Sequence, residues 1–99
     1  MTRSLPAALL ALLLIVVPAR ALEPDGLSFE RAIPIVAENS VEGVPKEYEY
    51  LRRHYPGWRR TMQALLRHEG RTYDRLTIVS PARETKDIYF DITSFFGKM

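Results

Sequence analysis

The stretch WRRTMQALLRHEGRTYDRLTIVSPARETKDIYFDI, residues 58–92, decides the fold because polar and apolar side chains alternate along much of it. A period of two is typical of strands that are buried on one face. Glu69-Gly70 falls where a tight hairpin turn is expected, since glycine adopts positive φ without strain. Two further strands follow over residues 71–79 and 86–92, separated by a turn. The stretch therefore predicts a three-strand antiparallel meander.

The same alternation predicts which side chains share a face. In the first strand, one face is expected to hold Trp58, Arg60, Met62, Ala64 and Leu66. The opposite face is expected to hold Arg59, Thr61, Gln63 and Arg67. In the third strand, the core positions are Ile88, Phe90 and Ile92, with Asp87, Tyr89 and Asp91 outward. Tyr73 has the opposite parity to Leu76 and Ile78, which predicts a bulge or an exposed ring.

A helix precedes this meander. Pro45 fits the first position of a helix, where its missing N–H is not needed, and Pro56-Gly57 ends the helix. Apolar side chains at helical spacing predict a stripe that faces the core. Its members are Val44, Tyr48, Leu51 and Tyr55. Glu47 is expected on the solvent side.

Shorter elements complete the order. Ser28 is expected to cap one helical turn that ends at Ala32, and residues 35–37 and 38–43 are expected to be a short strand and a loop. Thr93 is expected to cap a last helical turn that holds Phe95 and Phe96. The predicted class is α+β, with one main helix packed on a small antiparallel sheet. The order is strand, helix, three-strand meander, with short helical turns at both ends.

Residues 1–21 have the features of a secretory signal peptide. Arg3 supplies positive charge, and residues 7–17 form an unbroken apolar run. That run is too short for a permanent membrane helix, which needs about 20 residues. Ala19 and Ala21 are the small residues that a signal peptidase reads. We therefore expect an exported protein, periplasmic or secreted, with no permanent membrane span after cleavage.

The mature chain, residues 22–99, is expected to be one small domain without cysteine. The whole chain has 14 basic and 12 acidic residues, and loss of Arg3 and Arg20 with the signal leaves 12 of each. Acidic residues dominate residues 22–50 and arginines dominate residues 51–75. These segments are expected to complement each other or to be solvated. Because the mature chain is neutral and exported, no nucleic-acid partner is expected.

Four segments resemble a group of small, uncharacterised bacterial secreted proteins. They are GLSFERAI (residues 26–33), EYEYLRRHYPGW (47–58), ALLRHEGRTYDRL (64–76) and IYFDITSFFGK (88–98). The resemblance implies a bacterial exported domain and brings no activity with it. Residues 73–91 also resemble, more loosely, the PepSY-type modules of bacterial envelopes. That similarity implies a protein-binding or inhibitory accessory role.

The residues that commonly do chemistry predict neither a metal site nor a cofactor. His54 and His68 are the only histidines, and no metal-binding spacing includes them. Asp87 and Asp91 are expected on an outward strand face, as charges that favour solubility and protect a sheet edge. With His68, they are the candidates for a small hydrolase. We expect that the protein is not an enzyme.

Two surfaces remain as candidates. An arginine-bearing sheet face can hold phosphate or carboxylate groups; its members are Arg59, Arg67, Arg71 and Arg75. Tyr89 and Phe96 belong to an aromatic C-terminal segment, and exposed apolar patches mark interfaces.

The expected function is that of a non-enzymatic domain that binds another envelope or extracellular protein. Its surface would be the arginine face, a free sheet edge or the aromatic segment. An anion-binding module for phosphate or lipid headgroups is the alternative, and a small hydrolase is the second alternative.

Overall fold

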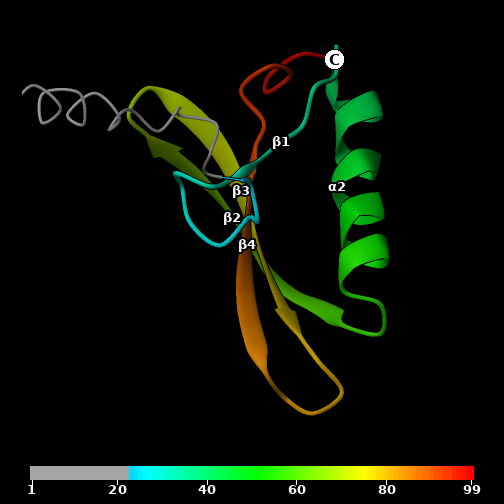
Figure 1. Cartoon of the computed structure of the whole chain (residues 1–99). Coiled ribbons are helices and arrows are strands. Elements are labelled where there is room, and N and C mark those ends of the chain that lie inside the picture. Colours follow the sequence, from blue (N-terminus) through cyan, green and yellow to red (C-terminus); the bar gives the residue numbers. More distant parts are fainter. Residues whose placement is uncertain (1–22) are drawn as a thin grey trace, which may run out of the picture.

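The computed structural model describes residues 23–99 (Figure 1). The predicted signal peptide and its cleavage residues lie outside this range. In chain order the elements are β1 (Ile33–Pro34), α2 (Ser40–His54), β2 (Arg59–His68), β3 (Arg71–Val79) and β4 (Thr85–Asp91). One helix packs against a small sheet, as the α+β class requires. Among the described residues, no helix is both long and apolar enough to cross a bilayer.

The sheet is mixed rather than wholly antiparallel. Its strands lie in the order β1-β4-β3-β2, and β2, β3 and β4 form the predicted antiparallel meander. β1 runs parallel to β4, with Ile33 opposite Phe90 and Pro34 opposite Asp91. The short strand therefore precedes the predicted range 35–37. Pro34 fits in it because β1 is an outer strand, where a missing N–H need not break a ladder.

The helix α2 begins earlier than the predicted start at Pro45. The Asn39 side chain accepts a hydrogen bond from the Glu42 N–H at 2.9 Å, and Glu42 Oε1 accepts one from the Glu38 N–H at 2.8 Å. These bonds satisfy N–H groups that lack partners at a helix start. Most of the predicted loop, from Ser40 onward, is therefore helical, and Pro45 lies inside the helix.

The core lies between α2 and the side of the sheet that faces it (Figure 1). Its members are Ile33, Ile35, Leu76, Ile78, Ile88, Phe90, Ile92 and Phe95. The predicted core positions of the last strand are thus confirmed. The predicted helical stripe, Val44, Tyr48, Leu51 and Tyr55, is partly buried against this cluster.

The approach of the C-terminal segment to α2 depends on Gly43. A β-carbon added at Gly43 would overlap the ring of Phe95, which is 2% exposed. The Ser40 N–H also donates to the Lys98 carbonyl at 3.1 Å. The start of the helix and the end of the chain are therefore packed together with no room for a side chain between them.

A β-bulge in β2 overturns the predicted faces of that strand. Arg60 pairs with Ile78, but Met62 pairs with Thr77, so Thr61 is an extra residue. An extra residue reverses the face of the sheet to which each following side chain of the strand points. Arg60 therefore lies on the helix side of the sheet, as Gln63, Leu65 and Arg67 do. The far side holds Arg59, Met62, Ala64, Leu66 and His68.

Phe29 covers part of the far side of the sheet. Its ring stacks on His68 at 4.1 Å and meets the rings of Tyr73 and Tyr89 at 4.9 and 4.8 Å between centroids. Tyr73 is 5% exposed, so the prediction of an exposed ring or a local bulge is wrong. Tyr73 and Leu76 lie on opposite faces of β3, and both side chains are buried because both faces of this strand are covered.

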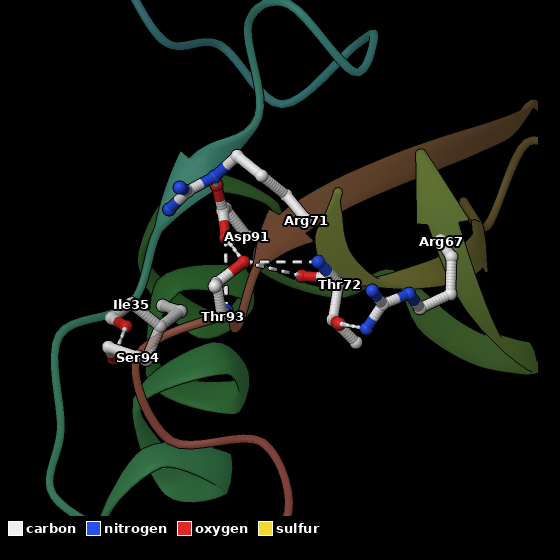
Figure 2. Close-up of polar contacts among 7 residues, drawn as sticks. All are labelled: Ile35, Arg67, Arg71, Thr72, Asp91, Thr93 and Ser94. Atoms are coloured by element: carbon white, nitrogen blue, oxygen red, sulfur yellow. Dashed lines mark hydrogen bonds and ion pairs between the residues drawn. The ribbon is translucent and has the colours of Figure 1, made fainter. Parts of the chain in front are cut away.

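The predicted terminal helical turns are not formed as helices. Near Ser28 the chain makes turns in which the Ser28 hydroxyl accepts from the Arg31 N–H at 3.2 Å. At the C-terminus, Ile92 accepts from the Phe95 and Phe96 N–H groups in a turn. Ser94 ties that turn to the chain after β1 by donating to the Ile35 carbonyl at 2.9 Å (Figure 2).

Replacing Gly43 by alanine is expected to destabilise the fold although alanine favours helix. Overpacking of a buried contact costs about 1–3 kcal/mol, which exceeds the ~1 kcal/mol that alanine contributes over glycine within a helix. Thermal melting followed by circular dichroism would measure this change. Val41→Ala, at an exposed helix position, is the control and should be nearly neutral. A Gly43→Ala variant that melts higher than the wild type would refute the packing argument.

Candidate functional site

A hollow lies between the second half of α2 and the beginning of β2. It has a volume of about 500 Å³. Its lining residues come from α2, from the turn after it and from the sheet. They are Tyr48, Leu51, Arg52, Tyr55, Pro56, Gly57, Trp58, Arg60 and Ile78. We call this hollow the aromatic groove. Its volume suits a few side chains of a bound chain or a small organic group.

Local structure places the aromatic rings of the groove. Gly57 has a φ of +87°, which lets the chain reverse directly after the helix. The Trp58 N–H donates to the Tyr55 carbonyl at 3.1 Å, and the two rings meet edge to face at 5.4 Å. The Arg60 guanidinium lies 4.7 Å from the centre of the Tyr48 ring. Both contacts hold flat apolar surfaces toward the groove.

The charged side chains of the groove are both arginines. Arg52 has one weak ionic contact, with Glu49 at 4.0 Å on the exposed helix surface. Arg60 has no ion pair with any other residue in the range 23–99. The groove therefore combines aromatic walls, an apolar floor at Ile78 and two arginines.

The groove lies beside the free edge of the sheet. β2 is the last strand in the sheet order, so one side of its backbone has no partner strand among the described residues. Met62 is 61% exposed and Leu65 is 54% exposed, on opposite faces of this strand. The strand sequence RRTMQALLRH contains three arginines and no acidic residue. Such an edge is a template for another extended chain.

Of the four arginines predicted to share a surface, Arg59, Arg71 and Arg75 lie on the far side of the sheet and Arg67 lies on the helix side. Arg59 and Arg67 lie on opposite faces because of the bulge. Arg67 donates to Thr72 Oγ1 at 2.9 Å, and Arg71 donates to Asp91 at 2.6 Å (Figure 2). Arg75 is half-buried and its Nε has no hydrogen-bond partner among the described residues. Two of the four are thus engaged within the fold itself.

The predicted carboxylates and histidines also lie apart from the groove. Asp87 accepts a hydrogen bond from Thr77 Oγ1 at 2.6 Å. Partial burial opposes the ionisation of Asp91, but hydrogen bonds from Arg71 and Thr93 outweigh it and lower the pKa of this carboxyl. β1 pairs with β4 only at Phe90 and Asp91, so Asp91 lies between two strands, whereas Asp87 is exposed beyond the end of β1. His68 stacks on Phe29, and His54 stacks on Tyr50 at 4.1 Å.

The aromatic residues near the C-terminus differ in how exposed they are. Phe96 is 45% exposed, whereas Tyr89 is half-buried against Phe29. Phe95 belongs to the core. A role of Phe96 and Tyr89 in binding a partner stays a prediction.

A buried pair of carboxyl groups was not predicted from the sequence, and the prediction that Glu47 faces solvent is wrong. Glu47 is 1% exposed and Asp74, on the helix side of β3, is 6% exposed. Burial, then the charge of Asp74 and a hydrogen bond with it, raise the pKa of Glu47 to about 9, while Arg60 acts in the opposite direction. Gln63 Nε2 donates to Asp74 Oδ1 at 3.3 Å. Helical spacing could have predicted this burial. Glu47 lies three residues after Val44 and four before Leu51, so it is on the same side of the helix as these two apolar residues.

This pair holds a proton within the structure. At neutral pH, Glu47 is protonated beside the Asp74 carboxyl group. One Glu47 oxygen, Oε2, has no hydrogen-bond partner among the described residues. Neither carboxyl group lines the aromatic groove. Their protonation therefore affects the packing of α2 against β3.

Replacing Glu47 by glutamine is expected to remove a pH dependence of stability. The folded protein binds a proton at Glu47 that the unfolded chain, with an ordinary carboxyl pKa of 4.5, releases. The free energy of unfolding therefore falls as pH rises from about 5 to about 9, by up to ~1.4 kcal/mol per pH unit. Urea unfolding at pH 5, 7 and 9 would measure the slope.

The control for this experiment is Glu49→Gln, on the exposed side of the same helix. It should keep the wild-type slope, and Glu47→Gln should flatten it. The pKa of Asp91 is lowered and those of Tyr50, Tyr55 and Tyr73 are raised, so these groups titrate outside the chosen range. Equal slopes in all three proteins would disprove the buried proton.

Comparison with known proteins found no matching family model, no matching curated protein and no matching solved structure.

Proposed function

We propose that this chain is an exported, non-enzymatic domain that binds an extended acidic segment of another envelope or extracellular protein. The observation that carries the proposal is the position of the aromatic groove directly beside the free edge of β2. The signal-like features of residues 1–21 support export.

A free strand edge can bind the backbone of such a segment, and the adjacent groove can bind its side chains. The backbone of an added strand pairs with the edge through hydrogen bonds that are independent of its sequence. Alternate side chains of that strand point to one face, and those on the helix side of β2 would meet the groove. Tyr48, Tyr55 and Trp58 offer flat surfaces to an aromatic or aliphatic side chain.

Charge selects the partner. Arg52 and Arg60 supply the charge of the groove, and β2 itself is basic. An acidic segment therefore gains from both surfaces. A second copy of this chain is disfavoured, because centred antiparallel pairing of two β2 strands would place Arg60 opposite Arg67. Like charges directly opposite each other destabilise a sheet.

Selection of random peptides against the purified protein would test the proposal. The expected result is enrichment of Asp or Glu next to an aromatic or aliphatic residue. Binding of a selected synthetic peptide can be followed by fluorescence, since Trp58 is the only tryptophan and lines the groove. Methylating alternate backbone nitrogens of the peptide should abolish binding if the peptide pairs as a strand.

The double variant Arg52→Ala plus Arg60→Ala should weaken the peptide about tenfold, equivalent to ~1.4 kcal/mol. Arg53→Ala, on the same helix but outside the groove, is the matched control and should bind as the wild type does. Selection of peptides without acidic residues, or equal loss in the double variant and the control, would contradict the proposed function.

A further inference from the structure

We infer that a second hollow, on the other side of the Gly57 turn, binds a phosphate group between Arg59 and Arg83. The hollow has a volume of about 380 Å³ and is lined by Gly57, Arg59, Val79, Ser80, Pro81 and Arg83. Only Gly57 is shared with the aromatic groove. This inference does not depend on the proposed peptide binding.

Two arginines supply all the charge of this second hollow. No acidic side chain lines it, and neither Arg59 nor Arg83 has an ion pair with any of residues 23–99. Guanidinium groups hold phosphate oxygens through paired N–H donors in a fixed geometry. An anion with two negative charges would neutralise both arginines, whereas a single carboxylate would leave one uncompensated.

Both arginines stand on well-defined backbone. Arg59 pairs with Val79 in the sheet. In the turn after β3, Ser80 is buried, and its hydroxyl accepts from the Ala82 and Glu84 N–H groups at 3.1 and 3.0 Å. The Arg83 N–H donates to the Ser80 carbonyl at 2.9 Å. The turn is therefore held by its own hydrogen bonds, and the hollow exists before any ligand arrives.

The conformation of Arg83 is unusual for its residue type. Its φ is +69°, in the left-handed region that favours glycine or asparagine. Arginine at such a position strains the backbone and brings a cation to a hollow that already contains Arg59. Backbone strain of this kind accompanies binding sites. Because of the bulge in β2, Arg59 lies on the far side of the sheet, opposite Arg67.

The test is titration of the purified protein with inorganic phosphate, followed by NMR of the arginine Nε–H resonances. The expected result is a saturable shift of the Arg59 and Arg83 resonances that sulfate reproduces and chloride of equal ionic strength does not. Arg83→Gly should raise the phosphate Kd at least tenfold. Glycine adopts positive φ freely, so this variant keeps the turn. Arg59→Gln should raise the Kd similarly.

The exposed Arg53 on α2 provides the control, because Arg53→Gln should leave phosphate binding unchanged. Vesicles that contain a phosphate-monoester lipid would distinguish the sources of the ligand. Sedimentation with these vesicles that is lost in Arg83→Gly identifies a lipid headgroup, and binding of inorganic phosphate alone identifies the free ion. Shifts spread over all exposed arginines, or unchanged affinity in Arg83→Gly, would overturn the inference.

Discussion

One extra residue in β2, Thr61, determines the orientation of the side chains on which both surfaces depend. Before it, Arg60 points to the helix side and Arg59 to the far side; beyond it the facing is reversed. Arg60 can therefore lie over Tyr48 and line the aromatic groove. Met62, Ala64 and Leu66 are placed on the far side, where Phe29 covers neighbouring rings. Bulges commonly redirect side chains in this way at sheet edges.

The buried carboxyl pair connects that arrangement to the packing of the helix. Glu47 and Asp74 meet where α2 crosses β3, and one proton between them avoids two adjacent buried negative charges. The positive charge of Arg60 acts on the same pair from the groove side. A small domain without disulfides depends on such packing, since it has no covalent bridge to limit the unfolded chain. The electrostatics of the core and of the groove are thus coupled through one residue of β2.

Two surfaces of different chemistry lie on either side of the Gly57 turn. The groove toward α2 is aromatic and apolar with arginine at its margin, and the hollow toward the turn after β3 is polar with two arginines. The first suits side chains of an extended partner, and the second suits a compact anion. The network of Arg71, Asp91 and Thr93 lies elsewhere and ties the C-terminal turn to β3 (Figure 2). Arginine content alone therefore does not locate a binding surface in this chain.

What the sequence determined by itself was local. Alternation defined β3 and the core positions Ile88 and Phe90, helical spacing defined the stripe of α2, and Glu69-Gly70 forms the expected turn with positive φ at both residues. These features follow from short-range rules of backbone geometry. The bulge, the contact of Gly43 with Phe95 and the burial of Glu47 were decided only by the tertiary structure. The same holds for the pairing of Arg59 with Arg83 in one hollow. Each of these joins residues far apart in the chain, and no periodic pattern records which distant side chain will lie opposite.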